Sequence, residues 1–337
     1  MRSISIAFQT DKPIAAYGAL ASTAEGYGFD GVTVYNDMLY QPAWLPLLEM
    51  ARHTHHVRLG LAAVNPFTCH PLNLAGNIAL IDEASQGRAY LGLARGAWLD
   101  FIGLDPPQPI TALREAFECV SHLLKQSPEP YQGKVFSLAG GDSLRWKILR
   151  PDVPMLLGTW GRKTIRACIE LIDEIKIGGT ANPDLIPLIR SDVREAASAV
   201  GGGPYTIGLV VGAVTVVDRD GEAARALARR KVALYLPVVA ELDRSLQLDP
   251  ELLTRIKEAT ARYDFDLATR SISNALLRRF AFAGTPDDVA QQAHDLFAAG
   301  ADRIEFGTPH GLTEEEGMRL LGEAVLPALK QEHGFSE

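Results

Sequence analysis

The chain has 337 residues, of which 47% are hydrophobic and 22% are charged, with a net charge of −8. This composition is typical of a globular protein with enough apolar material for a large core. The acidic balance argues against nucleic acid or an anionic membrane as the main partner. No run of about 18 apolar residues occurs, so no transmembrane helix is expected.

The N-terminal residues and the cysteines indicate the compartment. Residues 1–13 hold a short semi-apolar stretch followed by charges, which predicts a first strand rather than a signal peptide. Cys69, Cys119 and Cys168 are odd in number and far apart, which fits a reducing cytoplasm. No CxxC or HExxH spacing occurs, so we expect a cytoplasmic protein without a metal site.

Short apolar runs alternate with longer amphipathic stretches along the chain. Strands are predicted, in chain order, at residues 3–8, 31–35, 57–63, 88–93, 154–157, 174–177, 205–217 and 303–306. Helices are predicted at residues 13–27, 42–54, 72–84, 111–124, 163–172, 183–200 and 287–299. The first helix is expected to end at Gly28.

This alternation predicts the fold class. About eight strand–helix units in strict order imply parallel strands with right-handed crossovers. Over more than 300 residues they favour a closed α/β fold, a (β/α)8 TIM barrel, as one domain spanning residues 1–337. No GxGxxG follows the first strand, which argues against a dinucleotide-binding fold.

Two segments interrupt the alternation. Residues 128–150 are rich in proline and glycine and predict a short hairpin insertion. Residues 236–281 are helical in pattern but poorly tied to the barrel repeat. We interpret them as a helical insertion that forms either a lid or a dimer surface.

The active site of such a barrel lies at the carboxyl ends of its strands. The loops expected there are residues 35–38, 64–71, 94–98, 158–163 and 307–311. Asp37 could accept or orient a proton, or it could be a helix N-cap ahead of Pro42. Asn65 could bond a ring carbonyl or a planar amide, or it could form an Asx turn before Pro66.

The loop at residues 158–163 leads directly into a predicted helix. Its backbone N–H groups, with Arg162 and Lys163, could hold a phosphate. The alternative is a tight turn whose two cations face solvent. Taken together, these loops predict a polar site for an extended, planar, phosphate-bearing ligand.

Eight short motifs carry a resemblance that runs nearly end to end. They are FDG at 29–31, VNPFT at 64–68, IDEASQGR at 81–88, LREA at 113–116, YQGKVF at 131–136, GTWG at 158–161, AGTPDDV at 283–289 and GTPHG at 307–311. The chain resembles the bacterial-luciferase-like superfamily. Within it, the chain is most similar to the coenzyme F420-dependent methylenetetrahydromethanopterin reductase branch, and other relatives use FMN.

The resemblance implies where a cofactor would lie. It places a bulge near residues 62–65, often with a non-proline cis peptide, behind an isoalloxazine-like ring. The residues it implies around the ring, the ribityl chain and the phosphate are Asp37, Val64, Asn65, Ala94, Gly96, Thr159, Trp160 and Gly161. It also implies that Asp82 and Glu83 tie a helix to Arg88 at the base of the barrel.

Three departures from the family pattern concern the reaction. Met38 stands where the reductase branch has a histidine, and Ala7 stands where it has a glutamate. Ala94-Arg95-Gly96 replaces its Gly-Pro-Gly. These changes argue against carrying the pterin substrate over to this chain.

The leading hypothesis is an oxidoreductase that moves a hydride between F420 and a small organic substrate. Asp37 and His310 are the catalytic candidates, and Trp98, Trp160 and His310 are candidates for the substrate wall. One alternative is an FMN-dependent monooxygenase, in which His70 or His310 assists the reduced flavin. Another is a cofactor-binding protein without catalysis. The resemblance also implies a homodimer.

Overall fold

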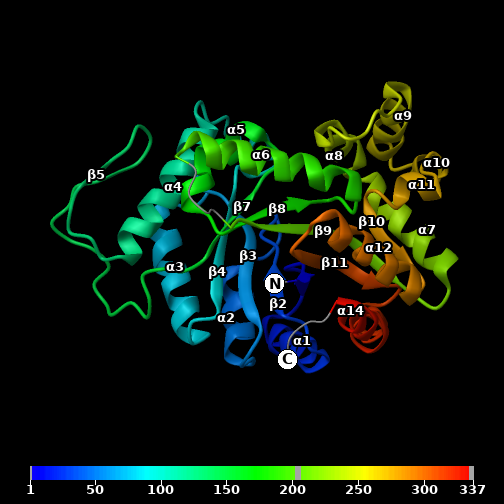
Figure 1. Ribbon diagram of the computed structural model, residues 1–337, viewed down its shortest axis with the longest axis horizontal. Coiled ribbons are helices and arrows are strands. Elements are labelled where there is room, and N and C mark those ends of the chain that lie inside the picture. The colour runs from blue at the N-terminus through cyan, green and yellow to red at the C-terminus, as the bar shows by residue number, and fades with distance from the viewer. Residues whose placement is uncertain (1, 202–205, 334–337) are drawn as a thin grey trace.

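The computed structural model describes residues 2–201 and 206–333. Within these residues, eight parallel strands close into a barrel (Figure 1). In order around the barrel they are β1 (Ser3–Phe8), β2 (Gly31–Val34), β3 (Arg58–Val64), β4 (Ala89–Ala94), β7 (Met155–Gly158), β8 (Glu174–Gly178), β9 (Gly208–Val217) and β11 (Arg303–Gly311). The predicted barrel is confirmed. Residue 205, the predicted start of the seventh strand, lies outside the described residues.

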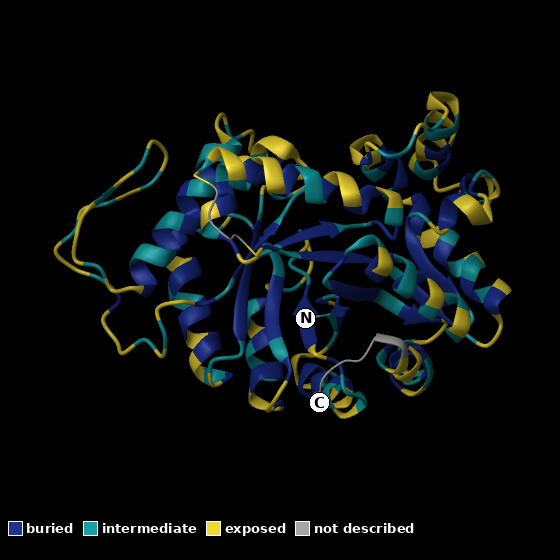
Figure 2. Ribbon diagram, viewed as in Figure 1, coloured by how far each residue is buried: buried dark blue, intermediate teal, exposed yellow. Residues whose placement is uncertain are grey.

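Helices surround the barrel. They are α1 (Ile14–Tyr27), α2 (Trp44–Arg52), α3 (Pro71–Ala84), α4 (Pro109–Leu124), α5 (Arg162–Cys168), α6 (Ile186–Ala199), α7 (Gly221–Ala233), α12 (Pro286–Ala299), α13 (Glu314–Leu320) and α14 (Leu326–His333). Their outer faces are exposed while the strands are buried (Figure 2). Helix α1 ends at Gly28 as predicted, where φ is 85° and glycine has no Cβ to strain.

The barrel interior holds a layer of polar side chains as well as apolar ones. Gly60 shows how tightly it is filled, because a Cβ there would lie 2.4 Å from the ring of Tyr90. Along each strand alternate side chains face this interior. Lys176 of β8 and Glu305 of β11 therefore meet inside the barrel, where they form an ion pair.

The hairpin insertion is confirmed and is held to the barrel by carboxylates. Strands β5 (Tyr131–Gln132) and β6 (Ser137–Leu138) pair antiparallel and project from the barrel (Figure 1). The carboxylate of Glu115 on α4 accepts three hydrogen bonds, at 2.7 to 2.9 Å, from the backbone N–H groups of residues 134–136. These bonds hold the pKa of Glu115 below its ordinary value despite burial.

The predicted tie between Asp82, Glu83 and Arg88 is wrong. Asp82 pairs with Arg150 of the hairpin insertion, with Nη2 and Oδ1 2.7 Å apart. Arg88 instead donates to backbone carbonyl oxygens, including those of Val57 and Thr54, each at 2.7 Å. The local motif could not reveal this, because Arg150 is distant in sequence from Asp82.

The helical insertion lies at the opposite end of the long axis from the hairpin (Figure 1). It comprises α8 (Leu236–Leu242), α9 (Pro250–Ala261), α10 (Phe265–Arg270) and α11 (Asn274–Leu277), which share a second apolar core with α7. The prediction that it is helical to residue 281 is wrong at its end. Ala281 begins the strand β10 (Ala281–Gly284), which pairs with the second half of β9. Four residues are too few to show an alternating pattern.

Candidate active site

The mouth of the barrel, defined here as the carboxyl ends of its eight strands, is shaped first by an irregularity in β3. The register between β3 and β4 shifts between Leu61 and Val64, and the peptide between Ala62 and Ala63 is cis. This lies within the predicted range of 62–65. Ala62 packs against Tyr90, Leu156 and Val210 in the interior.

Small residues line the neighbouring strand ends. A Cβ built on Gly158 would lie 3.2 Å from the Cβ of Ala94 and 3.7 Å from that of Ala63. A Cβ built on Gly178 would meet nothing within 4 Å, so Gly178 borders open space. Open space therefore borders the end of β8, whereas Gly158, Ala94 and Ala63 pack closely against one another.

Asn65 follows β3, and the oxygen of its side-chain amide is hydrogen-bonded. Its Oδ1 accepts from the N–H groups of Phe67 and Thr68, both at 3.0 Å, which is the Asx turn given as the alternative. Within the described residues its Nδ2 has no hydrogen-bond partner. A Cβ on Gly96 would come within 3.1 Å of this amide, so the two predicted residues are in contact. Val64 beside them is buried.

Asp37 lies in the exposed loop after β2. Its Oδ2 accepts a 2.7 Å hydrogen bond from Nε2 of Gln9, which follows β1. The side chain of Asn36, not Asp37, accepts from the N–H of Ala43 at the start of α2. The N-cap alternative for Asp37 is therefore not what the structure shows, and its carboxylate stays accessible at the mouth.

The loop from Gly158 to Lys163 is less open to an anion than its sequence suggests. Arg162 is drawn to α6, where its Nε lies 2.9 Å from Asp192 and its Nη2 lies 2.6 Å from Glu195. Thr159 accepts from the N–H of Gly161 at 3.1 Å. A phosphate here would have to compete with two carboxylates for Arg162.

His310 of β11 is buried rather than exposed at the mouth. Its Nε2 donates to the carbonyl oxygen of Ala7 at 3.0 Å, and its ring packs edge-on against Phe8. Burial lowers the pKa of His310 to about 4, so the ring is neutral near pH 7. Contact with a substrate would require this packing to open.

The two tryptophans proposed for the substrate wall differ in exposure. Trp98, after β4, is 64% exposed, whereas Trp160, after β7, is half-buried against the main core. Both belong to loops at the mouth. Trp98 has a positive φ of 53° and stands beside other exposed apolar side chains, those of Phe101 and Ile102.

A buried polar layer lies directly below the mouth. Glu305 accepts a 2.6 Å hydrogen bond from Thr33 in addition to pairing with Lys176, and Thr33 bonds to the hydroxyl of Tyr90 at 2.6 Å. Lys176 and Arg303 hold the pKa of Glu305 below its ordinary value, because their positive charges offset burial of the carboxylate. This layer was not predicted from the sequence. The signal available in the sequence was one charged residue at an inward-facing position in each of two apolar strands.

Within the described part of the chain, the three cysteines are free thiols and the possible metal ligands do not cluster. Burial raises the pKa of Cys69, and it raises the pKa of Cys119 and Cys168 to about 12, so all three remain protonated. Among residues 2–201 and 206–333, no group of three or more His, Cys, Asp and Glu is placed to hold a metal ion. In the same part of the chain no helix is long and apolar enough to cross a membrane.

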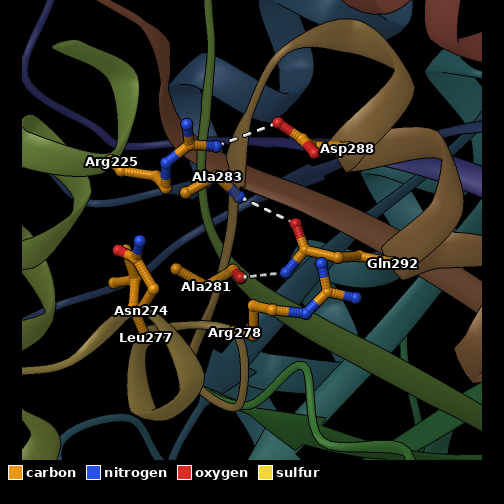
Figure 3. Close-up of a pocket in the computed structure, with 8 residues that line it drawn as sticks. All are labelled: Arg225, Asn274, Leu277, Arg278, Ala281, Ala283, Asp288 and Gln292. Atoms are coloured by element: carbon orange, nitrogen blue, oxygen red, sulfur yellow. Dashed lines mark hydrogen bonds and ion pairs between the residues drawn. The ribbon is translucent and has the colours of Figure 1, made fainter. Parts of the chain in front are cut away.

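A separate cavity of about 180 Å³ lies outside the barrel, between α7, α11, α12 and β10 (Figure 3). Arg225 pairs with Asp288 at 2.9 Å there, and Gln292 bonds to the backbone of Ala281 and Ala283. These polar groups therefore make most of their hydrogen bonds with one another. The cavity joins α7 and α12 to β10, which pairs with the carboxyl-terminal half of β9.

Comparison with known proteins places this geometry in a family. The family model described as luciferase-like monooxygenase matches residues 4–303. The chain belongs to this family. It is 28% identical to a 5,10-methylenetetrahydromethanopterin reductase from Methanopyrus kandleri, over 95% of this chain and 96% of the relative.

Solved structures agree with this placement. The coenzyme F420-dependent tetrahydromethanopterin reductase from Methanopyrus kandleri is similar with a TM-score of 0.89 and 26% identity, over 98% of this chain and 99% of that one. An F420-dependent secondary alcohol dehydrogenase shares the fold with a TM-score of 0.79 at 19% identity, over 98% of this chain and 99% of that chain. The luciferase-like resemblance inferred from the sequence is confirmed.

Proposed function

We propose that this protein is an oxidoreductase that transfers a hydride between coenzyme F420 and a small organic substrate. The observation that carries the proposal is the mouth itself, where the β3 bulge stands beside strand ends of glycine and alanine. The full-length similarity to F420-dependent reductases supports it. F420, when bound, supplies the ring carbon that gives or accepts the hydride.

The residues at the mouth fit a planar ring. Gly178 borders open space that a side chain would fill, and Gly158 and Ala94 leave the adjoining wall flat. Nδ2 of Asn65 is available to donate to a ring carbonyl. Asp37 would orient the ring or accept a proton through its exposed carboxylate, and the residues around Thr159 and Gly161 would lie along the ligand's tail.

The wider organisation is part of the same proposal. We take residues 1–337 as one domain of a cytoplasmic protein that works as a homodimer on a small molecule. Exposed apolar side chains on two neighbouring helices, Leu45 of α2 with Leu72 and Leu80 of α3, support an interface there. Light scattering of the purified protein would measure the mass of the assembly and would contradict the dimer if it gave 36.5 kDa.

An FMN-dependent monooxygenase is the second candidate, because the family model that matches is described by that activity. In this reading the absence of an exposed histidine near β2 and the burial of His310 leave His70, which is exposed after β3, as the nearby imidazole.

Two titrations of the purified protein would separate these functions. Binding of F420 and of FMN would each be followed by intrinsic tryptophan fluorescence, to which Trp160 should contribute. Tight binding of F420 alone, followed by saturable hydride transfer with a donor, would support the proposal. Tight binding of FMN alone with oxygen consumption would favour the monooxygenase. Binding of F420 without turnover on any donor would indicate a binding protein, and binding of neither would contradict all three.

A further inference from the structure

Tyr35 is the first residue after β2, and its side chain enters the mouth. Its N–H donates to the carbonyl oxygen of Phe8 at 3.0 Å, which extends the pairing of β1 and β2 by one residue. Thr33 faces the barrel interior, where it bonds to Glu305. Because alternate residues of a strand share a face, Tyr35 points to the same side one layer higher. It is half-buried.

A glycine on β11 makes room for the phenol ring. In register, Ala7 pairs with Thr33, and β1 lies between β2 and β11. A Cβ on Gly307 of β11 would lie 2.7 Å from the hydroxyl oxygen of Tyr35. The ring therefore crosses the end of β1 and reaches β11. A side chain larger than hydrogen at position 307 would block it.

A buried cation holds the ring from below. Nζ of Lys176 lies 4.9 Å from the centroid of the Tyr35 ring, within the range of a cation–π contact. Lys176 is fixed in turn by its ion pair with Glu305. Gly212 of β9 lies between them, and a Cβ there would come within 3.3 Å of Glu305 and 3.4 Å of Lys176. These contacts restrict where the phenol can point.

The hydroxyl of Tyr35 differs from the polar groups beneath it. Thr33, Tyr90, Lys176 and Glu305 all have hydrogen-bond partners. Within residues 2–201 and 206–333, the hydroxyl of Tyr35 has none. Burial, followed by the charge of Glu305, raises the pKa of Tyr35 well above its ordinary value. The group is thus a neutral phenol that can donate.

We propose that the hydroxyl of Tyr35 donates a hydrogen bond to a carbonyl oxygen or ring nitrogen of the planar cofactor bound at the mouth, and that Lys176, held by Glu305, is the positioning residue that aims it. This inference rests on the proposed function, because it needs a planar ring to bind there. It adds a ligand contact that no motif of the sequence indicated.

The test is the variant Tyr35→Phe, which removes one oxygen atom and keeps the ring on Lys176. Dissociation constants for oxidised F420 and for FMN would be measured by fluorescence titration of wild type and variant. We expect about tenfold weaker binding of whichever ring the wild type binds, as for a ligand acceptor left unpaired. Tyr263→Phe is the matched control, because Tyr263 is 83% exposed and lies beyond the end of α9. It should bind as the wild type does.

The positioning role needs a readout that loss of structure would not produce. Tyrosinate absorbance at alkaline pH would be recorded for the wild type and for Glu305→Gln. Subtracting the absorbance of the same protein carrying Tyr35→Phe isolates the signal of Tyr35. In the wild type the Tyr35 signal should appear above the pH at which exposed tyrosines ionise. In Glu305→Gln it should move to lower pH, because a negative charge beneath the phenol has been removed.

The outcomes separate the two proposals. Unchanged affinity in Tyr35→Phe, with the wild type binding a ring, would overturn the assignment of Tyr35 and leave the proposed function intact. Wild-type protein that binds neither ring would overturn both. An alkaline titration that is the same in Glu305→Gln and wild type would overturn the placement of Tyr35 above Glu305. A loss of affinity on Tyr35→Phe that is equally large in Lys176→Met and in wild type would overturn the positioning role of Lys176.

Discussion

The two ends of the barrel are built from different chemistry. At the amino ends of the strands, Glu174 pairs with Arg303 at 2.9 Å and with Arg58 at 3.4 Å, and both guanidinium groups stack on Tyr90. At the carboxyl ends, small residues border open space, and Tyr35 and Asn65 each keep a donor without a partner among the described residues.

The difference indicates that one end of the barrel contributes to stability and the other to ligand binding. The charges at the base are paired with one another, although Nε of Arg303 has no hydrogen-bond partner among the described residues, so removing one member of a pair should lower stability. Unpaired donors at the mouth contribute nothing to stability until a ligand accepts from them. Substitutions at the base should therefore change the free energy of unfolding, and substitutions at the mouth should change binding.

The largest effect is expected at the base. Glu174→Leu removes the carboxylate that neutralises Arg303, whose side chain is only 2% exposed. The free energy of unfolding should fall by about 4 kcal/mol, the cost of leaving a buried charge unpaired, while cofactor affinity is retained. Urea unfolding followed by circular dichroism would measure it. A loss below about 1 kcal/mol would show that the base layer is not stabilising.

His310 should affect the free energy of unfolding, as residues at the base do, although it lies near the mouth. Its pKa is about 4 in the folded protein and about 6.5 when unfolded, so only the unfolded chain binds its proton between these values. Its contribution is intact above pH 6.5 and falls by about 3 kcal/mol as the pH drops to 4.

The check is a comparison of unfolding free energies at pH 7 and pH 4. His310→Gln should lose less stability on acidification than the wild type does, because glutamine has no proton to gain. His55→Gln at an exposed position is the control and should follow the wild type. Equal acid sensitivity of His310→Gln and wild type would contradict the assignment of a buried neutral imidazole.

Filling the space at the mouth should abolish binding without unfolding the protein. Gly178→Leu places a side chain where a Cβ meets nothing within 4 Å. The dissociation constant of the cofactor should rise at least about a hundredfold, equivalent to about 2.7 kcal/mol. Gly26→Leu is the matched control, since it too enters open space but on the outer surface of α1. Retained affinity in Gly178→Leu would place the ring elsewhere.

The smallest effect is expected at Asn65. Two substitutions there distinguish its role in the loop from its role in binding the cofactor. Asn65→Asp keeps the oxygen that accepts from Phe67 and Thr68 but loses the Nδ2 donor. It should weaken cofactor binding by about 1 kcal/mol, and Asn65→Ala should weaken it further because the turn is also lost. If Asn65→Asp binds as tightly as the wild type, Asn65 acts only on the loop.

Sequence periodicity was sufficient for the barrel because its signal is local. All eight barrel strands were predicted from short apolar runs between helical patterns, and Gly28 marked the end of α1. Elements with weak local signals were missed. They include β10, which has four residues, and the helices α13 and α14 that follow the last strand. Helix α7 was also missed, although Asp220 is an N-cap residue that could have revealed it.

The candidate site likewise contains features that were predicted from the sequence and features that were not. The loops around Asn65 and Asp37 were predicted because each directly follows a strand end, and the bulge of β3 was predicted from the family resemblance. The pairing of Arg162 with α6, the burial of His310 and the Arg150–Asp82 pair were not. In each case the partner is remote in sequence and comes near only when the barrel closes.

The sequence by itself determined the alternation of strands and helices, the positions of the strand ends and the family. The alternation and the strand ends depend on neighbours along the chain and on the spacing of apolar residues, whereas the family was indicated by the resemblance of eight short motifs. Only the tertiary structure decided which polar groups are already paired and which remain free to meet a ligand. Lys176 and Glu305 are 129 residues apart, and only closure of the barrel brings them beneath Tyr35.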